Sequence, residues 1–350
     1  MSCLADKLLT LVQIESVIGN EGRLCEWLID RFSQLGDYAL DRVGNSFALR
    51  VGARQHPYLL GLVGHLDTVP PTADNPARIE SGRVFGLGSA DMKSGLALMW
   101  QLLEDPVRQP TCDLAFVFYD GEEGTYSGSG LGPLLEQLGW LSEIDLAICL
   151  EPSDNVLQLG CLGTLHAELT FRGKAAHSAR PWQGENAIHK AGALLTRLRD
   201  RPPTEVCFGD LIYREVISAT MAQGGSARNV IPDRFVVNLN FRFGPGRSLE
   251  AAQQVIRELV GDTAEVSFVD FAPSGDIPRD NPLLERLRRS CQLEEQAKQA
   301  WTDVARLSTA GIAAINFGPG ENAQAHQPRE STSIALLEEG DALLRKLISA

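Results

Sequence analysis

Three carboxylates crowd the end of a strongly apolar stretch at residues 119–124, whose sequence is YDGEEG. Residues 114–118 are entirely apolar and predict a buried strand, after which Asp120, Glu122 and Glu123 follow among two glycines. Like charges this close together repel, and they raise each other's pKa unless a cation lies among them. The stretch therefore points to a bound cation and poses the question of what chemistry that cation supports.

Histidine and carboxylate side chains follow three more apolar strand patterns, and one carboxylate precedes a helical pattern. They are His65 with Asp67 after residues 58–63, Glu151 after residues 145–150, His326 beyond residues 312–317, and Asp91 before residues 93–103. Ligands of open α/β sheets bind outside the carboxyl ends of the strands, so these loops can converge on one crevice. A set of nitrogen and oxygen ligands without cysteine suits Zn²⁺, Co²⁺ or Mn²⁺.

Each of these residues also has an ordinary explanation. A histidine at a strand end is more often structural than a ligand, a Glu-Glu pair usually lies in a solvated loop, and Glu151 could mark a turn before a proline. The joint pattern favours a metal site, because most of these residues end buried strands at the same expected edge. Asp67 adds support, since it lies two residues beyond His65 on the same side of an extended chain and can accept the second imidazole N–H. A dinucleotide fingerprint starting at Gly86 fails, because Asp91 stands where its third glycine belongs.

The bulk properties of the 350-residue chain are those of an ordinary globular protein with an acidic balance. Its net charge of −13 argues against nucleic acid or an anionic membrane as the main partner. No apolar run approaches the ~20 residues needed to span a bilayer, and the N-terminal sequence lacks the apolar core of a signal peptide. The seven cysteines are scattered without a C-x-x-C pair, so we expect reduced thiols in a cytoplasmic protein.

The periodicity of the sequence predicts two domains. In the first part, near-unbroken apolar strands alternate with helical patterns, which predicts an α/β domain of three layers, with a mostly parallel sheet covered on both faces. After Gly160, residues 165–171 and 234–243 alternate apolar and polar side chains, as strands with one wet face do. Helical patterns at 187–198 and 249–260 lie among these strands, and a strand pattern at 265–269 closes the set. The order β-α-β-β-α-β fits a small ferredoxin-like α+β module.

This α+β module is predicted to be inserted into the first domain. From about Pro273 the chain returns to helical patterns and to one apolar strand at residues 312–317. We therefore expect a metal-binding catalytic domain formed by residues 1–161 and 274–350, with an inserted domain formed by residues 162–273.

Four motifs resemble those of the aminoacylase/carboxypeptidase G family of two-metal amidohydrolases. They are GHLDTVP at 64–70, SADMKSG at 89–95, DGEEG at 120–124 and LEP at 150–152. Similar stretches also occur as HSARPWQGENAIH at 177–189, NVIP at 229–232, NFRF at 240–243, WTDVARL at 301–307 and NFGPGENAQAHQP at 316–328. The resemblance runs nearly end to end, and it implies that the inserted domain is a lid and dimerisation domain.

The resemblance also implies roles for individual residues around two divalent metal ions per chain, Zn²⁺ or Co²⁺. The implied assignment is His65 and Glu151 on one metal, Glu123 and His326 on the other, Asp91 as the bridge, Glu122 as the general base, and Asp67 as a further catalytic residue beside His65. One glutamate of the pair would then be a ligand, while its neighbour moves a proton from water to the leaving amine of an amide. These roles would explain why two adjacent glutamates follow the apolar strand pattern at residues 114–118.

Three residues of the inserted domain receive roles from the same resemblance. It implies a homodimer in which His177 reaches the partner's active site and stabilises the oxyanion, while Asn229 and Arg242 hold substrate oxygens or carboxylates. The ordinary alternatives are a surface-loop histidine for His177 and a salt bridge on a wet strand face for Arg242. The bidentate fork of arginine suits a small diacid, which favours the family roles.

The motifs leave the exact acyl group and amino acid of the substrate open. Within the family, the chain resembles most the members that remove an N-succinyl group from a diamino diacid. Residues 124–130 and 318–328 are also compatible with acetylornithine deacetylases, and Glu151 favours N-acyl-amino-acid hydrolases over peptidases that act on free amino termini. A non-catalytic homologue that serves as a binding module is the alternative from another class, but the complete set of five ligands with Glu122 argues against it.

Overall fold

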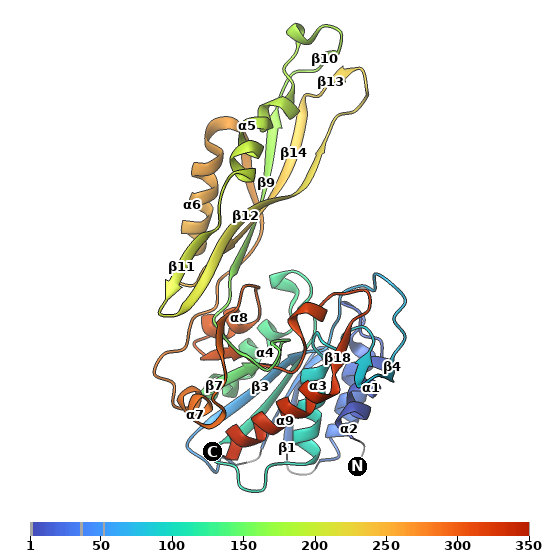
Figure 1. Cartoon of the computed structure of the whole chain (residues 1–350), viewed down its shortest axis with the longest axis vertical. Coiled ribbons are helices and arrows are strands. Elements are labelled where there is room, and N and C mark those ends of the chain that lie inside the picture. The colour runs from blue at the N-terminus through green and yellow to red at the C-terminus, as the bar shows by residue number, and fades with distance from the viewer. Residues whose placement is uncertain (1–2, 36–37, 52, 350) are drawn as a thin grey trace. The chain divides into compact units, whose positions relative to one another are not determined.

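The computed structural model describes residues 3–35, 38–51 and 53–349, and its contacts divide the chain into two compact units (Figure 1). Unit 1 comprises Met1–Gly160, Gly275–Lys298 and Thr302–Ala350, whereas unit 2 comprises Cys161–Ser274 and Gln299–Trp301. The role of residues 162–273 as a lid and dimerisation domain stays a prediction.

Unit 1 is built on a sheet whose central strands are parallel. In the described residues this sheet has eight strands in the order β1-β2-β6-β3-β7-β17-β8-β16. Their bounds are β1 Tyr38–Val43, β2 Ser46–Val51, β3 Leu59–His65, β6 Asp113–Tyr119, β7 Leu146–Cys149, β8 Leu157–Leu159, β16 Glu295–Ala297 and β17 Ala314–Asn316. Strands β6, β3, β7 and β17 run parallel, while β1 and β2 form an antiparallel edge and β8 pairs antiparallel with β17.

Both faces of this sheet are covered. Every residue of β3 and β6 is buried, and successive side chains of a strand point to opposite faces, so neither face of these strands is open to water. Helix α3 packs on β3, α4 packs on β1 and β2, and α8 packs on β17. The helices of unit 1 are α1 Leu4–Gln13, α2 Gly22–Phe32, α3 Lys93–Glu104, α4 Leu131–Gln137, α7 Pro282–Cys291, α8 Val304–Thr309 and α9 Ile334–Ser349. The predicted α/β class with a mostly parallel sheet is confirmed.

A small antiparallel sheet joins two segments of unit 1 that are far apart in the sequence. It contains β4 (Arg78–Glu80), β5 (Arg83–Phe85) and β18 (Ser331–Ser333), and Ser331 of β18 lies opposite Phe85 of β5. Strand β5 leads into the loop that carries Asp91, and β18 follows shortly after His326. This pairing therefore brings two of the predicted metal-binding segments together.

Unit 2 is an antiparallel sheet with both of its helices on one face (Figure 1). The order of the main sheet is β11-β12-β14-β9-β15. The elements of the unit are β9 Gly163–Arg172, β10 Ala176–His177, α5 Ala187–Arg199, β11 Thr204–Phe208, β12 Leu211–Gly224, β13 Val230–Ile231, β14 Arg234–Phe243, α6 Leu249–Val260 and β15 Glu265–Ala272. Without β11, the elements β9-α5-β12-β14-α6-β15 have the predicted ferredoxin-like succession.

Burial alternates strictly along β14, as the sequence pattern predicts for a strand with one wet face. Its buried side chains are Phe235, Val237, Leu239, Phe241 and Phe243, and they belong to a core that α5 and α6 complete. The side chains between them, from Val236 to Arg242, are only partly buried. Arg242 is therefore presented on the face of the sheet that the helices leave open.

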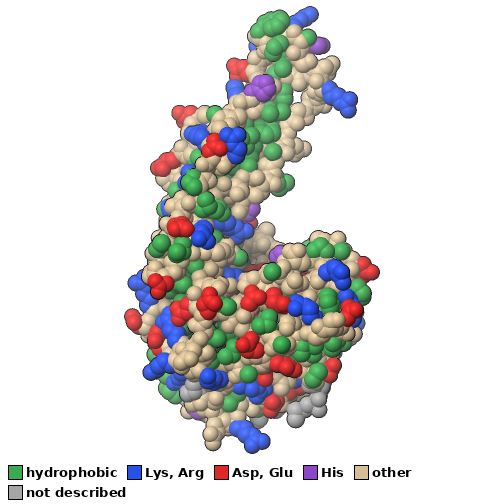
Figure 2. Space-filling model, viewed as in Figure 1, with side chains coloured by type: hydrophobic (Ala, Val, Ile, Leu, Met, Phe, Trp, Pro, Cys, Tyr) green, Lys and Arg blue, Asp and Glu red, His purple; other side chains and the backbone are tan. Residues whose placement is uncertain are grey.

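Charged side chains of both signs intermingle over the face of unit 1 that Figure 2 shows, despite the net charge of −13. The acidic surplus on this face is spread out rather than gathered in one patch. Among the described residues, no helix combines the length and the apolar character needed to cross a membrane.

Candidate metal centre

Three neighbouring parallel strands deliver the predicted site residues to one edge of the unit 1 sheet. His65 at the end of β3 is paired with Tyr119 at the end of β6, and Val63 is paired with Cys149 at the end of β7. The loops after these strands carry the Glu122–Glu123 pair and Glu151. Parallel strands whose ends are in register place the residues that follow them side by side, which is why separate segments of sequence meet here.

The first group of candidate ligands surrounds His65. Its Nε2 atom lies 3.3 Å from Oδ1 of Asp91 and 3.9 Å from Oε1 of Glu151. The histidine and the glutamate are almost completely buried. One ligand atom from each of the three residues lies within 4.8 Å of the others, so a single cation could contact all three.

The second group surrounds His326 and shares Asp91 with the first. Nε2 of His326 lies 3.0 Å from Oε1 of Glu123 and 3.4 Å from Oδ2 of Asp91. Asp91 thus presents one carboxylate oxygen to each histidine. The structure brings together all five residues that the sequence predicts as ligands, in the two groups that the prediction assigns.

The distances between the candidate ligand atoms suit two divalent cations, and so does a buried ligand oxygen that has no hydrogen-bond partner among the described residues. Zn²⁺ bonds of about 2.0–2.2 Å in tetrahedral geometry place two ligand atoms about 3.3–3.6 Å apart, close to the separations measured here. Oε1 of Glu151 is buried without a hydrogen-bond partner, and such an oxygen is costly unless a cation or donor satisfies it. Residues His65, Asp91, Glu123, Glu151 and His326 therefore suit a dinuclear site with nitrogen and oxygen ligands.

The carboxylates around the two histidines raise the pKa values of both rings. Burial opposes the charged form of His65, but hydrogen bonds with Asp67 and Asp91 raise its pKa well above the ordinary value. Hydrogen bonds with Asp91 and Glu123 raise the pKa of His326 to about 10. Despite its burial, contacts with both histidines hold the pKa of Asp91 below its usual range. The carboxylates that raise the pKa values of both histidines are thus the same ones that would share a cation with them.

Asp67 connects His65 to the two adjacent glutamates. Nδ1 of His65 lies 3.0 Å from the backbone carbonyl oxygen of Asp67 and 3.5 Å from its Oδ1, so both groups can orient the ring. The Asp67 carboxylate also accepts the backbone N–H of Glu122 at 3.1 Å and that of Glu123 at 2.9 Å. The sequence predicts the first contact but gives no sign of the second, which fixes the turn that presents both glutamates.

Glu122 faces the same space as the candidate ligands but sits in a different electrostatic environment. Its carboxylate belongs to a further group with His65 and Glu123 within 4.8 Å. Burial, together with the charges of Glu151 and Asp303, raises the pKa of Glu122 well above its ordinary value. Bound cations would counter these charges, lower the pKa again and favour the ionised form that a general base needs.

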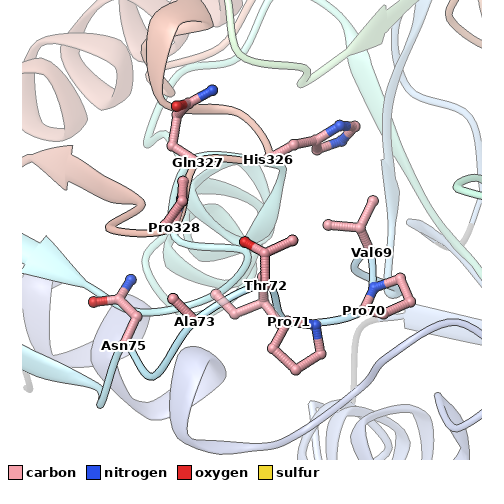
Figure 3. Close-up of a pocket in the computed structure, with 10 residues that line it drawn as sticks. Val69, Pro70, Pro71, Thr72, Ala73, Asn75, His326, Gln327 and Pro328 are labelled. Carbon is pink, nitrogen blue, oxygen red and sulfur yellow. The ribbon is translucent and has the colours of Figure 1, made fainter.

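A shallow pocket adjoins His326 (Figure 3). Residues 69–73, which follow shortly after the His65 strand, form one part of its lining, and Gln327 with Pro328 form another. The labelled side chains in Figure 3 are mostly small or apolar. His326 is the one ionisable side chain among the residues that line this pocket.

The three predicted residues of the inserted domain all lie in unit 2. His177 in β10 is exposed, and its Nδ1 accepts the backbone N–H of Ala179 at 3.1 Å, so in that tautomer Nε2 carries the proton and has no hydrogen-bond partner among the described residues. The carbonyl oxygen of Asn229 accepts the N–H of Ser178 at 2.9 Å, so His177 and Asn229 lie in neighbouring segments. Arg242 lies apart from them on β14, where its Nε donates to Oδ1 of Asn240 at 3.1 Å. Their predicted roles at the active site stay predictions.

Several residues that support the site are not predicted from the sequence. Asp303 is fully buried and accepts a hydrogen bond from Nε of Arg306 at 2.8 Å, and the Arg306 guanidinium lies 3.9 Å from the ring centre of Tyr126 in the loop after Glu123. Lys298 donates to the carbonyl oxygen of Pro152, directly after Glu151, at 3.1 Å. The signal available in the sequence was the position of Asp303 and Arg306 within WTDVARL, one of the stretches that resemble the family.

Comparison with known proteins defines the class of this chain. A model of the peptidase family M20/M25/M40 matches residues 61–350, and the chain belongs to that family. It is therefore a hydrolase of amide bonds from a metal-dependent family, which confirms the resemblance carried by the four motifs.

Two relatives are similar over almost the whole chain. A Corynebacterium glutamicum protein named succinyl-diaminopimelate desuccinylase is 34% identical over 352 residues, which cover 97% of this chain and 94% of that protein. A Mycobacterium tuberculosis protein that bears the same name provisionally is 38% identical over 342 residues, which cover 97% of this chain and 96% of that protein. These alignments cover so much of each chain that both units have counterparts in each relative.

Solved structures of lower identity share the fold. A tripeptidase from Staphylococcus aureus superposes with a TM-score of 0.82 at 22% identity, covering 99% of this chain and 97% of that one. The YXEP protein of Bacillus subtilis, described as a dinuclear metal-binding peptidase of the M20 family, superposes with a TM-score of 0.70 at 16% identity, covering 99% and 96%. These likenesses support the architecture alone.

Proposed function

We propose that this chain hydrolyses N-succinyl-LL-2,6-diaminopimelate to succinate and LL-2,6-diaminopimelate, a step of diaminopimelate and lysine biosynthesis. The names of the two relatives at 34% and 38% identity support this substrate. The observation that carries the reaction class is the Asp91 carboxylate, whose two oxygens face two different histidines. That arrangement suits a pair of cations that act on one amide.

The proposed metals are two divalent ions per chain, Zn²⁺ or Co²⁺. His65 and Glu151 would hold one ion, Glu123 and His326 the other, and Asp91 would bridge them. When bound, such ions polarise an amide carbonyl and lower the pKa of a water molecule to roughly 7. The nitrogen and oxygen donors and the unpartnered Oε1 of Glu151 support this assignment.

Glu122 is the proposed general base. It would accept a proton from the attacking water and pass that proton to the leaving amine as the amide C–N bond breaks. Asp67 supports this role, because it accepts the N–H groups of Glu122 and Glu123 and so holds the base next to the ligand. Asp67 would also keep His65 in the orientation that presents Nε2 to a metal.

Unit 2 would supply substrate recognition and would complete the site in a homodimer. His177 has Nε2–H available as a donor and would stabilise the developing oxyanion in the partner's site. Arg242 and Asn229 would bind the carboxylates or oxygens of the diacid, for which the fixed fork of arginine is well suited. The proposed location is the cytoplasm, where buried free thiols such as Cys25 and Cys112 stay reduced.

The experiment that tests this function compares two substrates with one enzyme preparation. The purified, metal-loaded protein is assayed in parallel on N-succinyl-LL-2,6-diaminopimelate and on N-acetylornithine, and the released amine is measured. A much higher kcat/KM for the succinyl substrate is expected. The Glu122→Gln variant, purified in the same way, is the control for contaminating hydrolases. A higher kcat/KM for N-acetylornithine would make that compound the substrate in place of the succinyl compound. Activity on neither compound would refute the proposed substrate.

A further inference from the structure

Glu330 is a buried carboxylate that the proposed reaction does not use. Its side chain is 1% exposed, and its oxygens accept hydrogen bonds from the loop between β5 and α3. Oε2 accepts the N–H of Gly88 at 2.8 Å, while Oε1 accepts the N–H groups of Ala90 at 2.7 Å and Asp91 at 3.0 Å. Three backbone N–H groups of one loop thus converge on a single buried carboxyl group, and each of these hydrogen bonds would be costly to leave unmade.

The loop is attached at further points by the same segment. The backbone carbonyl of Glu330 accepts the N–H of Gly86 at 3.1 Å and the side-chain amide of Asn75 at 2.9 Å. Two residues later, the Thr332 hydroxyl donates to the carbonyl oxygen of Ser89 at 2.6 Å. Residues 86–91 are thus held along their length by the segment that contains Glu330 and β18.

The loop needs such an external attachment because it has no regular structure of its own. Gly86 and Gly88 have φ values of +137° and +79°, so the backbone between β5 and α3 is neither helical nor extended at these residues. Buried backbone N–H groups must find acceptors, and in this loop a side chain provides them. Without Glu330, the N–H groups of Gly88, Ala90 and Asp91 would lose their acceptors in a buried environment.

The attachment joins two proposed ligand segments. Glu330 comes four residues after His326, and it bonds the backbone of Asp91, whose carboxylate lies 3.3 Å from His65 and 3.4 Å from His326. We propose that Glu330 is a positioning residue that fixes the Asp91 backbone, so that one carboxylate reaches both histidines and both metals bind tightly. This inference rests on the proposed metal centre.

The test is a Co²⁺ titration of metal-free protein, followed by visible absorption and by calorimetry. Glu330→Gln keeps the shape of the side chain but places an amide NH₂ group against at least one backbone N–H donor. We expect Co²⁺ binding roughly 10- to 100-fold weaker than in the wild type, as is typical when a residue that orients a metal ligand is lost. The absorption of the bound Co²⁺ should also change, because the Asp91 carboxylate is no longer held in one position.

Asp113→Asn is the matched control. Asp113 is 8% exposed and accepts the backbone N–H groups of Gln55 at 2.9 Å and His56 at 3.0 Å, but it lies at the start of β6, whereas the site follows its end. This variant should lose stability in thermal unfolding and still bind Co²⁺ as the wild type does. If Glu330→Gln does not fold, Thr332→Val tests the same loop through Ser89, with weaker Co²⁺ binding again expected.

The Co²⁺ titration tests the proposed metal centre and the proposed role of Glu330 separately. Wild-type protein that binds fewer than two Co²⁺ ions would refute the proposed metal centre itself. Wild-type protein that binds two ions, with unchanged affinity and absorption in the Glu330→Gln variant, would overturn the role of Glu330 alone. Equal weakening in the Asp113→Asn control would also overturn it, because general loss of stability would then explain the effect.

Discussion

Glu123 and His326 are 203 positions apart in the sequence, yet Oε1 of the glutamate lies 3.0 Å from Nε2 of the histidine. His326 is also 3.4 Å from Asp91, which contacts His65 with its other carboxylate oxygen. The two groups of candidate ligands are therefore coupled through one side chain. Changes to residues of one group should affect metal binding, whereas changes to Glu122 should affect proton transfer.

The two adjacent glutamates should respond differently to the same substitution. Glu122→Gln should retain metal and lose turnover by roughly 10²- to 10⁴-fold or more, because an amide cannot accept the proton of water. Glu123→Gln should instead lower the bound metal per chain. Metal analysis combined with single-turnover assays distinguishes the two. If Glu122→Gln loses metal and keeps its rate per bound ion, the roles are reversed.

Removal of metal should abolish activity and lower thermal stability together. A chelator leaves five clustered ligands without their cations, and any ion that binds only the folded state stabilises it by mass action. Activity and the melting temperature should both recover on addition of Zn²⁺ or Co²⁺, whereas Mg²⁺ serves as a control ion that prefers all-oxygen sites. Full activity in metal-free protein would contradict the proposed mechanism.

Metal binding should release protons near neutral pH. The raised pKa of His326, about 10, means that its ring is protonated at pH 7, whereas a metal ligand must be neutral. Affinity for Co²⁺ should therefore rise as the pH rises toward 10 and weaken as the pH falls. In metal-free protein the sign is opposite: the ion pairs of His326 stabilise the fold fully below about pH 6.5, and this contribution is lost as the pH rises through the raised pKa. Calorimetry in buffers of different ionisation heat counts the protons, and the absence of release at pH 7 would disprove the expectation.

Arg242 should contribute to the recognition of a diacid substrate. Arg242→Ala should lower kcat/KM by an amount equivalent to roughly 2–5 kcal/mol if its pairing with a substrate carboxylate is buried. Arg234 lies on the same strand and the same face, forms a loose pair with Glu168 at 3.9 Å, and provides the control substitution. Equal kcat/KM values for Arg242→Ala and wild type would mean that Arg242 only braces the sheet.

His177 should act in the partner's active site. An oxyanion donor is worth about 2.7–4 kcal/mol in comparable enzymes, so His177→Ala should be strongly impaired. Mixing His177→Ala with Glu122→Gln should restore part of the activity, because one site of each mixed dimer has an intact Glu122 and receives an intact His177. Labelled subunits verify that exchange occurs. No recovery after confirmed exchange would place His177 in its own chain's site or outside catalysis.

The central strands and the candidate ligands are predictable from the sequence because their signals are local. An apolar run such as residues 113–119 is buried on both faces, and the charged residues just beyond it contrast sharply with the strand. The β-α-β-β-α-β order requires a strand where β12 lies, but the sequence pattern does not locate it, because residues 218–224 are all exposed and carry no alternation. Strand β11 is short, and it too is largely exposed.

The residues that support the site form hydrogen bonds with segments far away in the sequence, which no local pattern reveals. Glu330 is bonded to Gly88 across 242 positions, and Lys298 is bonded to Pro152 across 146 positions. Both side chains are buried charges that would ordinarily be placed on the surface. Most of their partners are backbone atoms, and the one side-chain partner, Oδ1 of Asn322 at 3.3 Å from Nζ of Lys298, is an uncharged amide that no local pattern links to a lysine.

The core of unit 2 is made from its own strands and helices, with Leu169 and Phe171 of β9, Leu239 and Phe241 of β14, and Ile256 of α6 among its members. The candidate metal ligands, by contrast, all belong to unit 1. Mutations that reshape the surface of unit 2 therefore leave the ligand-bearing strand ends untouched. In evolutionary terms, substitutions on the surface of unit 2 can accumulate without any change to the candidate metal ligands of unit 1.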